Sequence, residues 1–211
     1  MQLFSESNSI NLKIEDGEVI YYPNFVNNKD ANLLFEYLLN QIPWQLDKIT
    51  VFGKTYNQPR LTSFYSELDT PLKYSNVTMY PHKFDSKLLK LKKTIEQLSK
   101  VTYNCCLLNQ YRDGNDSNGW HADDEKQLGK NPEIASLSLG AERMFHLKHK
   151  FKPHKKEKIK LQHGSLLLMK GATQHYWLHQ IPKTKQNIKS RINLTFRSIK
   201  EETEFPQTRF L

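Results

Sequence analysis

The feature that most constrains this chain is a series of short segments with strand composition that fills its second half. Aliphatic, aromatic and β-branched residues are concentrated in these segments, and turn-forming residues separate one segment from the next. We expect strands at residues 102–111, 134–139, 143–149, 158–162, 165–170 and 191–199. Many short strands in succession are typical of a β-sandwich or jelly roll, so residues from about 100 to 200 should form an all-β core.

Helical spacing is found in the first half. Between residues 28 and 42 apolar residues recur every three or four positions, and Asn28 and Asp30 are candidate N-terminal caps. A second helix is expected at about residues 86–100, where an apolar stripe lies among lysines. Because helices come first and strands later, the pattern predicts an α+β fold, and the length suits one domain over residues 1–211.

The chain is basic, since 31 Lys and Arg residues against 22 Asp and Glu residues give a formal net charge of +9. Such an excess favours a polyanionic partner, either nucleic acid or an anionic membrane face. A protein that is merely rich in lysine would show the same balance, so both interpretations stay open. The basic run HKFKPHKKEK at residues 149–158 lies between two expected strands, and we interpret it as a solvated hairpin loop.

Cysteine usage and hydropathy bear on the compartment. Cys105 and Cys106 are neighbours in an expected strand and point to opposite faces, which disfavours a mutual disulfide and fits a reducing environment. The first residues lack the layout of a signal peptide, and no apolar run approaches the ~20 residues that span a bilayer. We therefore expect an intracellular monomer without a membrane partner, cytoplasmic in a bacterium and with the nucleus as an option in a eukaryote.

The last expected strand, RINLTFR, has two distinct faces. Ile192, Leu194 and Phe196 share one face, and the other face carries Arg191, Asn193, Thr195 and Arg197. The polar face is either plain surface or an anion receptor, because guanidinium groups bind carboxylates through paired hydrogen bonds.

The stretch GWHADDE at residues 119–125 places a histidine beside three acidic residues in a basic chain. In an extended segment, His121 and Asp123 point to the same side and can reach one metal ion. Two histidines and one carboxylate, with coordination positions left open, suit non-haem Fe(II). The second histidine must come from elsewhere, and the spacing leaves His175 and His179 equally eligible; the weaker candidates are His146, His149, His154 and His163.

Taken in order, these motifs resemble those of the AlkB family of Fe(II)- and 2-oxoglutarate-dependent dioxygenases, which repair alkylated nucleobases. The resemblance covers residues from about 51 to 199 and is strongest to the branch that contains the human DNA and RNA demethylases. It rests on N-x-Y from Asn109 to Tyr111, HADDE, IASLSLGAER, HGSLLLM, WLHQIP and RINLTFR.

The resemblance implies a double-stranded β-helix, or jelly-roll, core with N-terminal helices and a nucleotide-recognition lid at about residues 45–80. It implies that His121, Asp123 and His179, rather than His175, hold Fe(II), and that Arg191 pairs with the distal carboxylate of 2-oxoglutarate. The residues that would complete the 2-oxoglutarate pocket are Asn109, Tyr111, Asn193, Thr195 and Arg197. O2 is the remaining cosubstrate.

The implied reaction is oxidative demethylation of bases such as 1-methyladenine and 3-methylcytosine, with release of formaldehyde, succinate and CO2. These lesions carry positive charge at neutral pH. Asp124 resembles the acidic residue of the family that contacts the base, and a local carboxylate favours a cation. A basic exterior for phosphates and an acidic pocket for the cationic base would explain the carboxylates beside His121.

Substrate contacts are also implied in the lid. Phe52, Gly53 and Lys54 belong to VFGK, which resembles an apolar finger that replaces a flipped base in the stack. Tyr74 matches a pocket tyrosine of the family, and Asn76 stands where a duplex-acting relative has an aromatic residue. Arg60 would fix the lid or bind a phosphate.

The sequence mixes patterns of duplex-acting and single-strand-acting relatives. Alkylated DNA is the expected partner and RNA is an option. The alternative is an oxygenase of the same chemistry directed at another modified RNA base or at a substrate other than nucleic acid.

Overall fold

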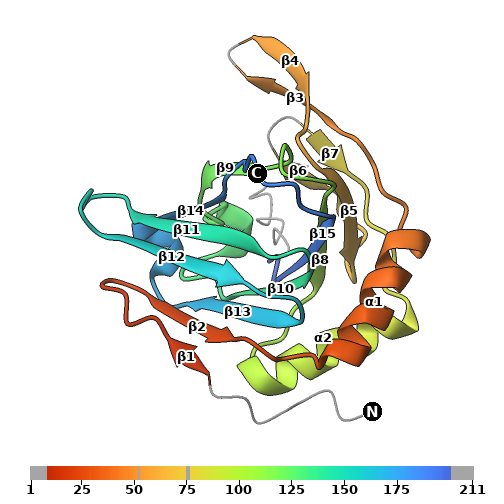
Figure 1. Cartoon of the computed structure of the whole chain (residues 1–211), viewed down its shortest axis with the longest axis horizontal. Coiled ribbons are helices and arrows are strands. Elements are labelled where there is room, and N and C mark those ends of the chain that lie inside the picture. The colour runs from red at the N-terminus through yellow and green to blue at the C-terminus, as the bar shows by residue number, and fades with distance from the viewer. Residues whose placement is uncertain (1–8, 52, 75–76, 201–211) are drawn as a thin grey trace, which may run out of the picture.

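Two antiparallel sheets face each other in the computed structural model of the protein, which describes residues 9–51, 53–74 and 77–200 (Figure 1). The large sheet has the strand order β1 (Ile10–Asn11), β2 (Glu18–Tyr22), β13 (Ser165–Lys170), β10 (Ile134–Gly140), β15 (Arg191–Arg197), β8 (Cys105–Tyr111), β5 (Leu61–Ser66). The small sheet has the order β12 (Lys156–Leu161), β11 (Arg143–His149), β14 (Trp177–Ile181), β9 (Asn118–His121). This arrangement confirms the predicted jelly roll.

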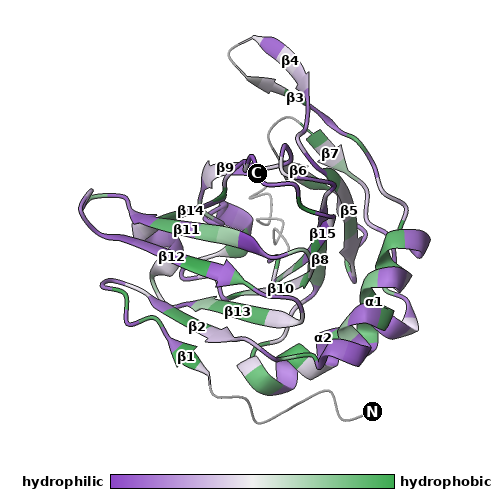
Figure 2. Ribbon diagram, viewed as in Figure 1, coloured by the Kyte–Doolittle hydropathy of each residue, from purple (hydrophilic) through white to green (hydrophobic). Residues whose placement is uncertain are grey.

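The expected strands are all present, with differences at their ends. The largest is in β8, which begins at Cys105 instead of residue 102. β9 ends at His121, so the stretch expected to be extended through Asp123 leaves the sheet after the histidine. Hydrophobic residues are concentrated in the strands, whereas the loop between β11 and β12 is hydrophilic (Figure 2). None of the described helices combines the length and apolar character needed to span a bilayer.

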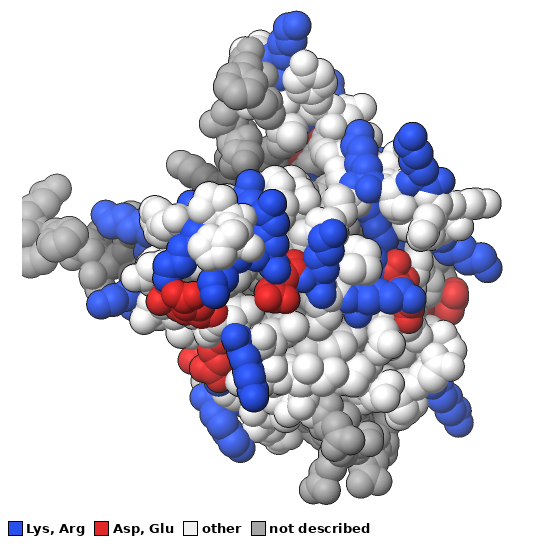
Figure 3. All heavy atoms as spheres, turned by 60° about the vertical axis from the view of Figure 1, so that its left-hand side comes forward, with Lys and Arg blue, Asp and Glu red and all other residues white. Residues whose placement is uncertain are grey.

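The hairpin predicted for the basic run at 149–158 is present, but its loop covers only residues 150–155, because β11 ends at His149 and β12 begins at Lys156. The first residue of the basic run, His149, differs from expectation because it is only 3% exposed and packs edge-on against Trp177. Lysine and arginine side chains are spread over this side of the molecule, whereas acidic side chains gather in a few clusters (Figure 3).

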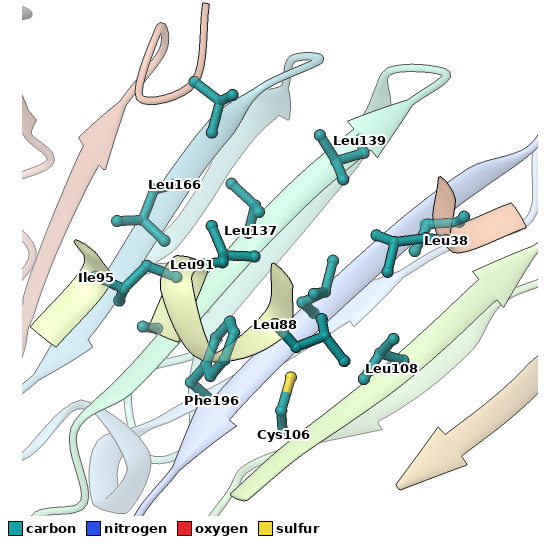
Figure 4. Packing of buried hydrophobic residues seen from close by; sticks show 14 of the residues in the cluster. Leu38, Leu88, Leu91, Ile95, Cys106, Leu108, Leu137, Leu139, Leu166 and Phe196 are labelled. Carbon is teal, nitrogen blue, oxygen red and sulfur yellow. The ribbon is translucent and has the colours of Figure 1, made fainter. Parts of the chain in front are cut away.

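A core between the large sheet and two helices holds one side of the fold together. In β15, Ile192, Leu194 and Phe196 point into this core, as the period-two pattern predicts. Helix α2 (Ser86–Ser99) contributes the apolar stripe expected from the sequence, and Figure 4 shows Leu88, Leu91 and Ile95 packing toward the sheet.

Helix α1 (Asn28–Gln41) packs on the same side of the sheet. Its N-terminal cap is Asn27, whose side chain accepts a hydrogen bond from the backbone N–H of Asp30. Neither Asn28 nor Asp30 is the cap, so that prediction was wrong by one and three residues. Asn28 already belongs to the helix, and a cap must have the non-helical backbone that Asn27 shows.

Short hairpins and turns complete the fold. β3 (Lys48–Val51) pairs with β4 (Lys54–Asn57) in a hairpin that projects from the body, and β6 (Leu72–Tyr74) pairs with β7 (Val77–Met79) (Figure 1). A 3₁₀ turn, η1 (Lys126–Leu128), follows β9, and a one-turn helix, α3 (Thr173–Tyr176), precedes β14. The two cysteines are buried and free, as expected from their positions in β8.

Candidate metal centre

Three side chains distant in the sequence converge between the two sheets. His121 ends β9, His179 lies directly opposite it on β14, and Asp123 follows β9 by two residues. The potential ligand atoms of these residues all lie within 4.8 Å of one another. His179 Nε2 is 4.0 Å from Asp123 Oδ2, and the two imidazole rings are 4.2 Å apart between centroids. The geometry therefore assembles two imidazoles and one carboxylate around a single point.

The structure separates the two histidines that spacing left equivalent. His175 lies in α3, where its exposed ring accepts a hydrogen bond from the backbone N–H of Asn131 at 3.3 Å. His163 accepts a hydrogen bond from the backbone N–H of Gly140 at 2.8 Å, which is a structural role in a turn. Only His179 of these three faces His121 and Asp123.

The protonation states suit a metal ligand set. Burial, followed by the neighbouring His121, lowers the pKa of His179 to about 3. Burial also lowers the pKa of His121. For Asp123, burial raises the pKa, but the charge of Arg197 and the two imidazoles outweigh it, so the pKa lies below its ordinary value. Two neutral imidazoles and an ionised carboxylate are the forms that donate electron pairs to a divalent cation.

Surrounding groups hold each ligand in place. The backbone carbonyl of Gly119 lies 2.8 Å from His121 Nδ1, which favours Nε2 as the ring atom for a metal; the side-chain amide nitrogen of Asn118 lies 3.1 Å from Nε2. The ring of Phe145 stacks on His179 at 5.2 Å between centroids. The backbone N–H of Asp123 donates to Gln174 Oε1 at 2.9 Å, and Gln174 is fully buried. Such outer contacts fix the orientation of ligands before a metal binds.

A buried guanidinium group lies in the same pocket. Arg191 begins β15 and is 1% exposed; its Nη2 donates to Ser138 Oγ at 2.8 Å, and its guanidinium lies 5.1 Å from the centroid of the Tyr111 ring. Burial lowers the pKa of Arg191 to about 10, while the Tyr111 hydroxyl opposes that shift, so the group stays charged at neutral pH. Its Nε and Nη1 have no hydrogen-bond partner within residues 9–51, 53–74 and 77–200.

Buried cations without partners are costly, and a carboxylate is the group that satisfies two guanidinium N–H groups at once. The second carboxylate of a dicarboxylic acid could then extend toward the three metal ligands. The residues present therefore fit both Fe(II) and 2-oxoglutarate. The polar face of β15 is a buried pocket wall, and the plain-surface interpretation is excluded.

The other residues expected at the 2-oxoglutarate pocket line the same cavity. Asn109, Tyr111, Asn193, Thr195 and Arg197 all line it. Thr195 Oγ1 donates to Asn193 Oδ1 at 3.0 Å, and Asn193 Nδ2 donates to Ser136 Oγ at 2.8 Å, so these side chains are pre-oriented.

Arg197 occupies the opposite end of β15 from Arg191. Its Nη2 donates to Asp123 Oδ1 at 2.6 Å, so it holds a candidate metal ligand. Six residue-to-residue steps of extended strand separate the two arginines by roughly 20 Å at the backbone, so they do not clamp one carboxylate together.

The expected base-contacting residues lie at the rim or outside the described residues. Asp124 is exposed and forms an ion pair with Lys150 at 2.8 Å. Gly53 and Lys54 are exposed in the β3–β4 hairpin, where Gly53 has a φ of +73°. The backbone of Tyr74 ends β6. Phe52 and Asn76 lie outside the described residues.

Four contributors were not assigned to the site from the sequence: Gln174, Phe145, Ser136 and Ser138. Of the two roles expected for Arg60, fixing the lid is the one that its contacts support. Arg60 is 4% exposed and its Nε donates to Asn109 Oδ1 at 2.8 Å, so it ties the segment at residues 45–80 to β8. Its Nη1 also donates to the backbone carbonyl of Ser117. The sequence around Arg60 resembles that of an exposed lid, so it gave no indication that the side chain is buried against Asn109 and Ser117.

Comparison with known proteins supports the site. The profile of the 2OG-Fe(II) oxygenase superfamily matches residues 18–197. The bovine alpha-ketoglutarate-dependent dioxygenase alkB homolog 3 is 44% identical over 84% of this chain and 64% of its own length. DNA oxidative demethylase ALKBH2 of Arabidopsis thaliana is 36% identical over 92% of this chain and 72% of its own length.

The chain thus spans just under two thirds of the length of the alkB homolog 3 proteins that it matches, including the human one at 66%. A solved structure, titled "The structure of OsALKBH1", superposes with a TM-score of 0.65 at 17% identity, covering 90% of this chain and all of that chain. At that identity the superposition supports the fold. Together with the geometry above, these matches show that the chain belongs to the AlkB family within the 2OG-Fe(II) oxygenase superfamily.

Proposed function

We propose that this protein is an Fe(II)- and 2-oxoglutarate-dependent dioxygenase that demethylates N-alkylated nucleobases. The observation that carries the proposal is the convergence of His121, Asp123 and His179 beside the buried Arg191, whose Nε and Nη1 lack partners among the described residues. The names of relatives in this family, among them DNA oxidative demethylase, support the choice of substrate class.

One set of residues in the pocket would bind the metal, and another would bind the dicarboxylic acid. His121, Asp123 and His179 would hold Fe(II), and Arg191 would bind the distal carboxylate of 2-oxoglutarate. When bound, Fe(II) would supply the activation of O2, the oxidant: one oxygen atom converts the N-methyl group to a hydroxymethyl group, which leaves as formaldehyde, and the other oxidises 2-oxoglutarate to succinate and CO2. The chain contributes position and a dry setting, because Asp123, His179 and Arg191 are each at most 5% exposed.

The substrate side is argued from charge. Methylated bases such as 1-methyladenine and 3-methylcytosine are cationic, and Asp124 lies one residue from the ligand Asp123. Because Asp124 pairs with Lys150 here, the cationic base would take the place of the lysine ammonium. The positive net charge suits a polyanionic substrate. Alkylated DNA is the proposed partner, and RNA is a second polymer for the same pocket.

The test is reconstitution of the protein with Fe(II) and 2-oxoglutarate without oxygen, followed by admission of O2. Oligonucleotides with one 1-methyladenine or 3-methylcytosine, single-stranded or duplex, are then analysed by mass spectrometry. We expect the loss of one methylene mass per lesion, with formaldehyde and succinate formed in equal amounts.

Asp123→Ala should abolish both products while lesion-DNA binding persists. Asp69→Ala, at an exposed carboxylate whose side chain is 92% accessible, is the matched control and should retain them. Turnover that survives in Asp123→Ala would defeat the assignment of the metal site. Succinate formation by the unchanged protein without any loss of methyl groups would defeat the choice of substrate.

A further inference from the structure

The outer face of the small sheet carries an unusual combination of lysines and one aromatic ring. The strand register, together with the alternation of side chains along each strand, shows which residues lie on this face. Lys148 pairs with Lys156 and His146 pairs with Lys158 across β11 and β12, so these four side chains share a face. It is the face opposite to Phe145 and Leu147, which point into the core between the sheets.

Trp120 joins this face from the edge strand. It precedes His121 in β9 and points the other way, and its ring lies 6.5 Å from the His146 ring between centroids. The ammonium of Lys148 lies over the indole ring, 4.4 Å from its centroid. Trp120 nevertheless remains 39% exposed, although tryptophan is a residue that proteins usually bury.

The lysines of this face differ from those of the adjacent loop. Lys152 and Lys155 in the loop form ion pairs with Glu15, and Lys150 pairs with Asp124. Lys148, Lys156 and Lys158 form no ion pair with any residue of the described ranges. At the far end, Lys160 pairs with Glu142. The positive charge of the basic run is thus neutralised in the loop and left available on the sheet.

We propose that this outer face is a docking surface for single-stranded nucleic acid, with a base stacked on Trp120 and phosphates held by Lys148, Lys156 and Lys158. A sheet face that combines an exposed aromatic ring with lysines suits a single strand, because unpaired bases offer a π-face and phosphates offer negative charge. This inference rests on the proposed function for its substrate, and it adds the path of the strand outside the pocket.

The position of the face relative to the metal centre supports this path. β9 is the edge strand of the small sheet, and the segment that follows it carries Asp123 and Asp124. A strand that delivers one base to the pocket can therefore continue over Trp120 toward β12. A duplex would keep its bases paired and present no free base to the ring.

The test measures binding, without metal or 2-oxoglutarate, to an unmodified oligothymidylate of about 15 nucleotides, within the ~4–16-nucleotide range of single-strand sites. Fluorescence anisotropy is recorded over a range of salt concentrations. The salt slope is the slope of the logarithm of the binding constant against the logarithm of the salt concentration. Each phosphate contact contributes about 0.7 to its magnitude for a single strand, so the double change Lys156→Gln with Lys158→Gln should lower that magnitude by about 1.4. The matched control is Lys90→Gln with Lys93→Gln, two exposed lysines on α2, and it should leave the slope unchanged.

Trp120→Ala should weaken binding at least about fivefold, the lower range for loss of one stacked base, and Trp120→Phe should restore most of it. A blunt duplex of the same length should be affected by neither change. Unchanged single-strand binding in the lysine and tryptophan variants overturns the proposal. The proposal is also overturned if the α2 control lowers the salt slope as much as the Lys156 and Lys158 changes do, or if duplex binding is weakened as much as single-strand binding.

A second assay distinguishes a failure of the proposed docking face from a failure of the proposed function. The unchanged protein is given a trinucleotide that contains 1-methyladenine, which is too short to cross the sheet. Failure to demethylate this trinucleotide and every longer lesion substrate would count against the proposed function, whereas the binding result concerns unmodified strands and metal-free protein. Demethylation together with unaltered binding in the variants would count against the docking face alone.

Discussion

Replacing Arg191 with methionine should separate folding stability from 2-oxoglutarate binding. In the protein without ligand, the guanidinium leaves Nε and Nη1 without partners among the described residues. Each unsatisfied buried donor costs about 1–3 kcal/mol. The substitution by methionine removes both unsatisfied donors. It also removes the hydrogen bond from Arg191 to Ser138 and the contact of the guanidinium with the Tyr111 ring. Those losses amount to about 0.5–1.5 and 0.5–2 kcal/mol.

In the absence of ligand, the balance makes the Arg191→Met variant more stable than the unchanged protein by about 1–3 kcal/mol, which raises the melting temperature by roughly 2–12 °C for a domain of this size. The effect on 2-oxoglutarate has the opposite sign. Loss of one partner of a buried charge pair costs about 2–5 kcal/mol, so the Kd of 2-oxoglutarate should rise at least about 30-fold. The assay is thermal unfolding with and without 2-oxoglutarate, with Fe(II) and without oxygen, followed by calorimetric titration.

Arg143→Met is the matched control, because Arg143 is also a buried arginine beside Tyr111. Its guanidinium donates to the backbone carbonyls of Asp113, Asp116 and Pro182. Loss of these bonds leaves carbonyls without donors, so this variant should melt at a lower temperature than the unchanged protein. An unchanged Kd for 2-oxoglutarate in Arg191→Met, or a loss of stability like that of Arg143→Met, would refute the account of this pocket.

Three further predictions concern other parts of the molecule. Gln174→Leu removes the acceptor for the Asp123 N–H and should weaken Fe(II) binding about 10- to 100-fold, measured by equilibrium dialysis, while the fold survives. Gly140→Ala places a Cβ 2.5 Å from the Ser190 carbonyl oxygen at a φ of +82°, so it should lower the free energy of unfolding by about 1–3 kcal/mol or more in urea titrations. Burial raises the pKa of Cys105 to about 11 and that of Cys106 well above its ordinary value, so at pH 8 both thiols stay protonated and iodoacetamide should label them only after unfolding. Rapid labelling of the native protein would contradict their burial.

Patterns that repeat along the chain predicted the fold well. The alternation in Arg191 to Arg197 assigned the correct residues to each face, because a strand has only two faces and burial selects between them. What that alternation could not decide is whether the polar face meets water. That depends on the small sheet lying opposite, which is a property of the tertiary structure.

The site was predictable only where its residues lie in recognisable motifs. Residue spacing could not choose between His175 and His179, since both follow β13; the one-turn helix α3 turns the first outward, and β14 turns the second inward. Gln174 was not found because it contacts Asp123 from 51 positions away through a backbone N–H that no motif marks. His149 was interpreted as a loop residue because its neighbours are lysines, although its ring packs against Trp177.

The central claim is that His121, Asp123 and His179 bind one Fe(II) ion, and an anaerobic Fe(II) titration of two matched variants tests it most directly. The unchanged protein and His175→Ala should each bind one Fe(II) per chain with similar affinity, because His175 lies outside the ligand cluster. His179→Ala should lose that binding, since it removes one of three ligands. Retention of tight Fe(II) binding by His179→Ala, with its loss in His175→Ala, would contradict the account.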